Sequence, residues 1–250
     1  MIPAYALDGD EDAPVLVLPG SLGTTRELWM PNLPTFAREF RVVRYEHRGH
    51  GASRVPRGPY SMEDLSRDAL DLLDALRIER ASWCGLSLGG MVGMWLGANA
   101  PGRLSALVLA CTSARVGAPT SYAERAALVR EQGIEPVADA IVARWFTLAP
   151  PETRQRIRAL LVAQPTEGYA ACCEAVAGWD FRAELSRVSV RTLVIAASED
   201  EATPEADTDL LVERIPGARR VTIAGAAHLA NLERPQEFAA AALAHLKEAA

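Results

Sequence analysis

Short apolar runs alternate with longer segments of helical spacing over residues 1–113. Four β-rich runs predict strands: residues 15–18 (VLVL), 41–45 (RVVRY), 81–84 (ASWC) and 104–111 (LSALVLAC). Residues 62–76 place apolar side chains at helical spacing after a start signal formed by Ser61 and Asp64, and residues 91–100 form a mostly apolar helix. This alternation predicts a buried, mostly parallel sheet flanked by helices.

The pattern changes between residues 114 and 188. Four segments have helical character and none is a clear strand: residues 121–132, 137–146, 151–163 and 168–177. Two strand-like runs and a last helix follow: residues 191–197, 218–223 and 235–247. We therefore predict a single α/β domain, in which residues 1–113 and 189–250 form the core and residues 114–188 form an inserted all-helical cap.

Composition narrows the range of functions. The chain has 250 residues, of which 49% are hydrophobic and 23% charged, and its formal net charge is −6. These values are typical of a folded globular domain and argue against disorder. The negative balance gives no electrostatic basis for binding nucleic acid or an anionic membrane. A homodimer is compatible with the sequence.

Two further features concern compartment and cofactors. Residues 1–9 lack the basic and apolar regions of a signal peptide, and no apolar run reaches the roughly 18 residues needed to cross a bilayer, so we expect a cytoplasmic protein. Cys84, Cys111, Cys172 and Cys173 form no C-x-x-C pair and are expected to be reduced structural thiols. No metal and no organic cofactor is expected, because the candidate ligands lack metal spacing.

Residues 85–90 (GLSLGG) follow a predicted strand and open a helix, which is the context of a G-x-S-x-G nucleophile turn. Small residues beside Ser87 let the backbone take the tight bend that lifts its hydroxyl above the sheet. The N–H of Leu88, at the start of the helix, then faces a developing oxyanion. The pattern predicts Ser87 as a nucleophile and the N–H of Leu88 as an oxyanion donor.

A serine hydroxyl needs a base near neutral pH, and the chain offers His47, His50, His228 and His245. The chain order expected with this turn is serine, acid, histidine, which His228 and His245 satisfy and the two earlier histidines do not. His245 lies within the last helix, whereas His228 follows the final predicted strand at the carboxyl edge of the sheet. We therefore predict His228 as the base.

The third member of a triad orients the histidine and should follow another strand at the same edge. Glu199, Asp200 and Glu201 come directly after the strand at residues 191–197. Asp200 is preferred because a short aspartate is the usual orienting group, and one loop rarely directs three acids inward. The two glutamates are expected to face solvent.

A second oxyanion donor is expected from the loop after the first clear strand, residues 19–23 (PGSLG). The N–H of Ser21 is our choice, and the N–H of Leu22 is the alternative. In isolation the same residues fit a plain tight turn equally well, so this prediction depends on the pairing of the loop with Ser87.

With these motifs and a helical insertion, the chain resembles the α/β-hydrolase fold family over essentially its full length. Several segments are similar to 3-oxoadipate enol-lactonases: SLGTT with Trp29, HRGHG, GPYSMEDL, CGLSLGGMVGMWLGANAP, RWFT, GYAACCEA with WDFR, and LVIAASEDEATP. Carried over by position, the resemblance implies the triad that strand ends and chain order indicate, Ser87, Asp200 and His228.

The resemblance implies hydrolysis of a small enol-lactone bearing a carboxymethyl group, giving 3-oxoadipate in the protocatechuate and catechol branches of aromatic catabolism. The substrate carboxylate requires a cation, for which we select Arg144 in the cap. Its neighbour Trp145 would form an aromatic wall for a planar ring. The charged residues of the helix at residues 121–132 are expected to face solvent.

Other functions remain open at this point. A general carboxylesterase or a cofactor-free perhydrolase would use the same triad and oxyanion hole. A small-molecule receptor built on a hydrolase fold would keep the cavity with slow turnover. An intact candidate triad argues against the receptor, and a small-molecule lactone or ester is the expected partner.

Overall fold

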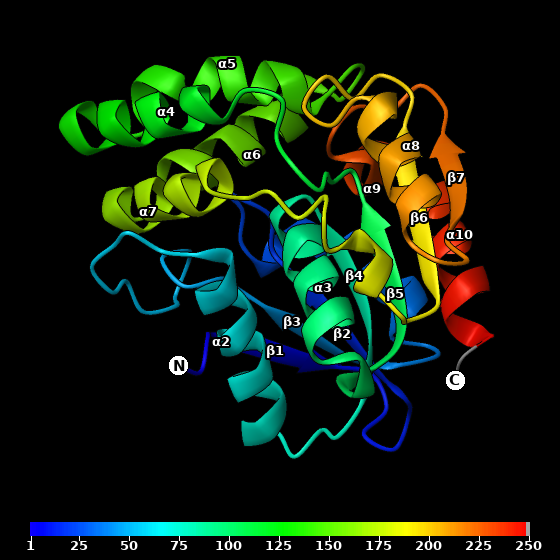
Figure 1. Ribbon diagram of the computed structural model, residues 1–250. Coiled ribbons are helices and arrows are strands. Elements are labelled where there is room, and N and C mark those ends of the chain that lie inside the picture. Colours follow the sequence, from blue (N-terminus) through cyan, green and yellow to red (C-terminus); the bar gives the residue numbers. More distant parts are fainter. Residues whose placement is uncertain (249–250) are drawn as a thin grey trace.

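The computed structural model describes residues 1–248 and is built around one twisted sheet (Figure 1). Among these residues the sheet has seven strands in the order β1-β3-β2-β4-β5-β6-β7, and only the pair β1–β3 is antiparallel. The strands are β1 Tyr5–Asp8, β2 Val15–Pro19, β3 Arg41–Tyr45, β4 Ala81–Leu86, β5 Leu104–Ala110, β6 Thr192–Ala197 and β7 Arg219–Ile223. The predicted mostly parallel sheet is confirmed.

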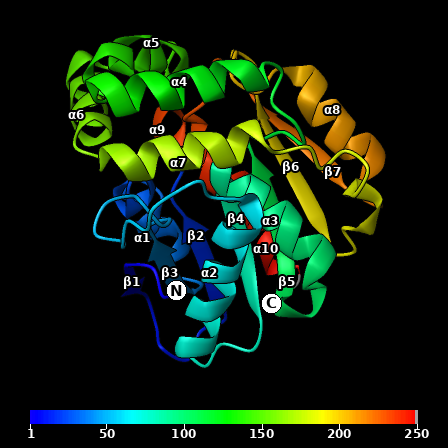
Figure 2. The same ribbon diagram turned by 60° about the vertical axis from the view of Figure 1, so that its left-hand side comes forward.

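Helices cover both faces of the sheet. They are α1 Leu33–Phe36, α2 Met62–Ala75, α3 Leu88–Asn99, α8 Glu205–Arg214, α9 Ala230–Glu233 and α10 Pro235–Lys247, with 3-10 turns at Arg26–Trp29, Pro101–Arg103 and Leu185–Arg187. α3 packs against β4 and β5 from one face, beside α2, while α10 packs against β5 and β6 from the other (Figure 2). Because parallel strands covered on both faces are buried, β4 and β6 are buried at every position.

Four helices, which we call the cap, lie over the carboxyl ends of the strands: α4 Pro119–Gln132, α5 Glu135–Trp145, α6 Pro151–Val162 and α7 Thr166–Ala177 (Figures 1 and 2). Within the cap, α4 packs against α7, and α5 packs against α6. An isolated bridge between Arg115 and Asp180 joins the two connections at the base of the cap. The cap therefore covers the edge of the sheet where the candidate catalytic residues are predicted.

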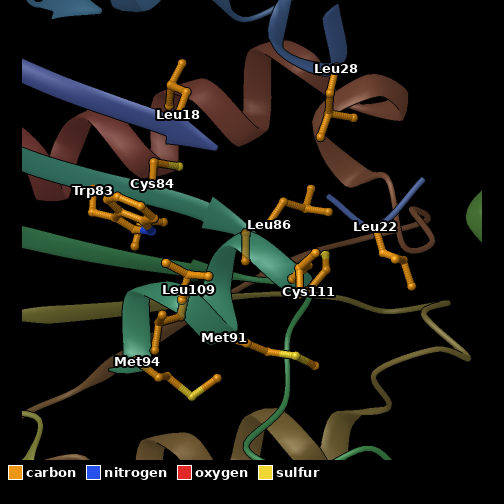
Figure 3. Packing of buried hydrophobic residues seen from close by; sticks show 14 of the residues in the cluster. Leu18, Leu22, Leu28, Trp83, Cys84, Leu86, Met91, Met94, Leu109 and Cys111 are labelled. Atoms are coloured by element: carbon orange, nitrogen blue, oxygen red, sulfur yellow. The ribbon is translucent and has the colours of Figure 1, made fainter. Parts of the chain in front are cut away.

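The apolar core joins the strands to α3. Leu18 of β2, Leu86 of β4 and Leu109 of β5 belong to one buried cluster with Met91 and Met94 of α3 (Figure 3). This packing fixes the start of α3 relative to the ends of three strands. The turn between β4 and α3 is therefore held on both sides.

The predicted helix start at residue 61 is confirmed. Ser61 Oγ accepts the N–H of Asp64 at 3.1 Å, and Asp64 Oδ2 accepts the N–H of Ser61 at 2.9 Å, which forms a capping box. All four cysteines are buried with free thiols. None of the helices described combines the length and the apolar character required to span a bilayer.

Several short elements were not predicted, among them β1 and α8. β1 has only four residues and alternates exposed with half-buried positions, because it is an edge strand paired on one side to β3. α8 buries only Thr208 and Leu211, so it lacks a recognisable apolar stripe. The strand predicted to reach Cys111 ends at Ala110, because Cys111 adopts a φ of +43°.

Candidate active site

Ser87 lies in a strained turn between β4 and α3. Its φ of +54° and ψ of −114° place it outside both strand and helix, in a region that residues with a side chain rarely adopt. Its N–H donates to Ala110 O at 2.9 Å, and its carbonyl accepts the hydroxyl of Thr112 at 2.8 Å. These bonds to the end of β5 hold the strained conformation in place.

Close packing explains why glycines flank Ser87. A Cβ atom on Gly85 would lie 2.1 Å from Gly89 O, and one on Gly89 would lie 2.6 Å from Pro19 Cγ. Neither position has room for a side chain. The predicted need for small residues at this turn is confirmed, and its cause is the contact of the turn with itself and with the end of β2.

His228 and Asp200 form a buried hydrogen-bonded pair. His228 follows β7, Asp200 follows β6, and His228 Nδ1 lies 2.9 Å from Asp200 Oδ2. Asp200 is 5% exposed, whereas Glu199 and Glu201 are exposed. The structure therefore directs the aspartate inward and leaves both glutamates in solvent.

The hydrogen bonds around Asp200 keep it ionised. Its Oδ1 accepts the N–H groups of Ala202 at 2.8 Å and Thr203 at 3.0 Å, and its Oδ2 accepts the Thr203 hydroxyl at 2.5 Å. Burial alone would raise the pKa of Asp200, but the charge and hydrogen bond of His228, together with Thr203, hold the pKa below its ordinary value. A charged carboxylate fixes the proton of His228 on Nδ1 and leaves Nε2 free to act as a base.

Ser87 and His228 line the same cavity, which has a volume of about 300 Å³ and lies between the sheet edge and the cap. The core contributes Ser21, Leu22, Ser87, Ala202 and His228, and the cap contributes Tyr122, Arg125, Pro136, Val137, Ala140, Ile141, Arg144, Trp145 and Tyr169. The lining is mostly apolar and includes two arginines but no carboxylate. It therefore suits a small substrate that carries a negative charge.

Ser21, the oxyanion donor expected from the sequence, lines the cavity, but its N–H is directed into its own loop. Its N–H already donates to Thr24 Oγ1 at 2.7 Å, and the carbonyl of Ser21 accepts the N–H of Thr24 at 3.1 Å. The alternative, Leu22, lines the cavity, and its N–H makes no hydrogen bond within residues 1–248. Leu88 is the first residue of α3, where an N–H has no partner within the helix. Leu22 and Leu88 are therefore the candidate donors taken up in the proposal below.

Arg144 and Trp145, the two cap residues selected from the sequence, both line the cavity but differ in setting. Trp145 is buried, and its carbonyl accepts the N–H of Leu229, next to His228, at 3.1 Å. Arg144 is exposed, and its Nη2 donates to the carbonyl of Glu201 at 2.7 Å. The guanidinium of Arg144 therefore already has an acceptor at the mouth of the cavity.

The expectation that the charged residues at 121–132 all face solvent is wrong for Arg125. Arg125 is half-buried, lines the cavity, and places its guanidinium carbon 4.6 Å from the ring centroid of Tyr122. No carboxylate within the described residues lies within 4.0 Å of it. Tyr122, Arg125 and the buried residues Ala126 and Val129 recur at helical spacing, and this shared face was the signal that could have identified Arg125.

The remaining histidines lie outside the cavity lining. His245 is on α10, with Nε2 3.2 Å from Arg191 O. His47 and His50 are buried beneath the loop that carries Leu22. Of the four histidines, the structure places only His228 in the cavity, as predicted from the order of residues along the chain.

Comparisons with known proteins found matches over most of the chain. The alpha/beta hydrolase fold family matches residues 13–235. The chain is 40% identical over 238 residues to 3-oxoadipate enol-lactonase 2 of Acinetobacter baylyi, covering 94% of this chain and 89% of that protein. It is 34% identical over 236 residues to 3-oxoadipate enol-lactonase 1 of the same organism, covering 93% and 88%.

Similarity extends to three dimensions. The crystal structure of the enol-lactonase from Burkholderia xenovorans LB400 superposes with a TM-score of 0.95 at 39% identity, over 98% of this chain and 96% of that one. Because both chains are covered almost completely, the core and the cap are shared with that structure.

Proposed function

The chain belongs to the alpha/beta hydrolase fold family, and on that premise we propose that it hydrolyses 3-oxoadipate enol-lactone to 3-oxoadipate through a triad of Ser87, His228 and Asp200. The observation that carries this proposal is the buried His228–Asp200 pair, which opens onto the same cavity as the strained Ser87. The names of the two Acinetobacter relatives support the choice of a lactone.

Acylation begins with His228. Its Nε2 takes the proton of the Ser87 hydroxyl while Ser87 Oγ attacks the lactone carbonyl carbon. The N–H groups of Leu22 and Leu88 donate to the resulting oxyanion, and each such donor contributes about 3 kcal/mol in comparable sites. Asp200 stabilises the positive charge that forms on His228.

Ring opening follows when the tetrahedral intermediate collapses. The bond between the carbonyl carbon and the ring oxygen breaks, and the leaving group is an enolate that remains attached to the acyl chain. The enolate takes up the proton that His228 removed from Ser87 and becomes a ketone, which returns His228 to its neutral form. Because an enolate is a better leaving group than an amide anion, its expulsion depends less on proton donation by His228 than amide cleavage would. Water, deprotonated by His228, then attacks the acyl carbon and releases Ser87.

The carboxymethyl group of the substrate needs a cation, and Arg125 fits this role better than Arg144. The guanidinium of Arg125 is half-buried with no carboxylate partner among the described residues, whereas Arg144 is exposed and already bonded to Glu201 O. A half-buried guanidinium without a carboxylate partner gains most from an incoming carboxylate. We propose that Arg125 binds the substrate carboxylate and that Trp145 packs against the ring.

This activity would place the protein in the breakdown of aromatic compounds, in the cytoplasm. The test is the turnover of freshly generated 3-oxoadipate enol-lactone, followed by loss of its ultraviolet absorbance, with an aryl ester as comparator. Wild-type enzyme should consume the lactone, and Ser87→Ala should lower kcat by about 10⁴-fold or more.

The aryl ester distinguishes the proposed lactonase from the alternative functions. Ester cleavage without lactone turnover would indicate a general carboxylesterase or a perhydrolase. Ligand binding that survives Ser87→Ala, with no turnover by the wild type, would indicate a receptor.

A further inference from the structure

Two buried histidines bracket the loop that carries Leu22. His47 Nε2 lies 3.0 Å from Gly20 O, and His50 Nε2 lies 2.8 Å from the N atom of Gly23. Both imidazoles are almost fully buried, at 2% and 0% exposure. One ring therefore holds the carbonyl before Leu22, and the other holds the N–H after it.

The loop leaves a single donor free. From residue 20 to residue 24, four of the five backbone N–H groups have an acceptor: Gly20 to Tyr45 O at 3.0 Å, Ser21 to Thr24 Oγ1 at 2.7 Å, Gly23 to His50 Nε2 at 2.8 Å and Thr24 to Ser21 O at 3.1 Å. Of these five N–H groups, only that of Leu22 has no acceptor among the described residues. The loop therefore presents one donor, at the position where Leu22 lines the cavity.

The two rings must be in opposite tautomers. A backbone carbonyl only accepts, so His47 Nε2 carries its proton and donates to Gly20 O. A backbone N–H only donates, so His50 Nε2 is unprotonated and the proton of His50 lies on Nδ1. Protonating either ring fully, or exchanging the tautomers, would break the bond to the loop or leave a buried charge.

The surroundings of the rings favour these neutral forms. Burial lowers the pKa of His47 to about 3, with a further lowering by the adjacent His50, and burial lowers the pKa of His50 to about 4. His50 Nδ1 lies 3.4 Å from Arg48 O and 3.8 Å from Cys172 Sγ of α7. Both rings are neutral at pH 7, and His50 connects the loop to the cap.

We propose that His47 and His50 are positioning residues of the oxyanion hole, which fix the direction of the Leu22 N–H by holding Gly20 and Gly23. This inference rests on the proposed function, because the direction of that N–H affects catalysis only if an oxyanion forms in this cavity. Neither imidazole touches the substrate. Their effect is on kcat, since the oxyanion exists in the transition state and not in the bound substrate.

The first test compares His50→Leu with His50→Gln. Leucine removes the acceptor of the Gly23 N–H, whereas the glutamine Oε1 can take the place of Nε2. Complete loss of one oxyanion donor costs about 10²- to 10³-fold in kcat, so a misdirected donor should cost about 10- to 100-fold. We expect that loss in His50→Leu with little change in KM, and recovery of most of kcat in His50→Gln.

His245→Leu is the matched control for a merely structural effect. His245 is also buried and bonded to a backbone carbonyl, that of Arg191, but it lies on α10 away from the cavity. The substitution His245→Leu should lower the melting temperature without lowering kcat. A kcat for His50→Leu that falls no further than that of His245→Leu, or His50→Gln as impaired as His50→Leu, would overturn the proposal.

A second measurement does not depend on activity. Long-range ¹⁵N–¹H correlation spectra of the wild-type enzyme distinguish protonated from unprotonated imidazole nitrogens. We expect His47 protonated on Nε2 and His50 protonated on Nδ1 at pH 7. The same tautomer at both positions would refute the bracketing hydrogen bonds.

The experiments distinguish an error in the proposed substrate from an error in the proposed positioning role of the histidines. If the wild type cleaves the aryl ester and not the lactone, the proposed substrate is wrong, and the same histidine variants are compared on the ester. The ester needs the same oxyanion hole, so the predicted ratio of His50→Leu to His50→Gln is unchanged.

Discussion

The residues at the strand ends and the residues of the cap are fixed in different ways. Ser87, Asp200 and His228 each lie within a few residues of a strand, so a short turn determines where each side chain points. Arg125 and Arg144 lie on α4 and α5, whose rotation and packing decide which side chains reach the cavity. The candidate catalytic residues are thus positioned by short local turns, whereas the candidate cationic residues are positioned by the packing of helices.

The largest expected effect concerns the residues at the strand ends. Asp200→Asn should lower kcat by about 10⁴-fold, because an amide cannot stabilise charged His228 and favours the wrong tautomer. Glu201→Gln is the control, since Glu201 is in the same loop but exposed. Steady-state kinetics on the lactone provide the measurement, and similar losses in the two variants would contradict the assignment of Asp200.

The free energy of unfolding should depend on pH through His50, which lies at the junction between the two regions. Because burial lowers the pKa of His50 from 6.5 to about 4, protons bind more readily to the unfolded chain. The resulting stability is present above pH 6.5 and is lost as the pH falls through this interval, by about 3 kcal/mol in total. Urea unfolding at pH 7 and at pH 4.5 should show a smaller loss for His50→Gln than for the wild type. Equal losses would mean that His50 is not buried in its neutral form.

The smallest expected effect concerns the cap. Arg125→Met should raise KM for the anionic lactone by about 10- to 100-fold, since a hydrogen-bonded charge contributes about 1.5–3 kcal/mol. Arg144→Met should raise it less, because Arg144 is exposed and bonded to Glu201 O. The neutral aryl ester should be cleaved alike by both variants. A larger effect in Arg144→Met would return the carboxylate site to the residue selected from the sequence.

The sequence was sufficient where local chemistry dictates structure. The glycines around Ser87 follow from steric contact, and Asp200 could be preferred to Glu199 and Glu201 because a short side chain suits the pair with His228. These arguments need only a turn and the order of the strands.

The sequence was insufficient where two distant segments decide the outcome. The loop sequence alone favours the N–H of Ser21 over that of Leu22, and only the position of Thr24 Oγ1 shows that the N–H of Ser21 is occupied. The sequence favours Arg144 because it adjoins Trp145, whereas Arg125 reaches the cavity through the packing of α4 against α7. Side-chain direction on a weakly patterned helix is not determined by its own residues.

The most direct test of the account is the mass of the acyl-enzyme trapped by acid quench during lactone turnover. In a lactone the leaving oxygen stays attached to the acyl chain, so Ser87 should gain the mass of the entire lactone, and the adduct should map to the peptide containing Ser87. Ser87→Ala should show no adduct and no turnover. Lactone hydrolysis that persists in Ser87→Ala, or an adduct on another residue, would contradict the proposed mechanism.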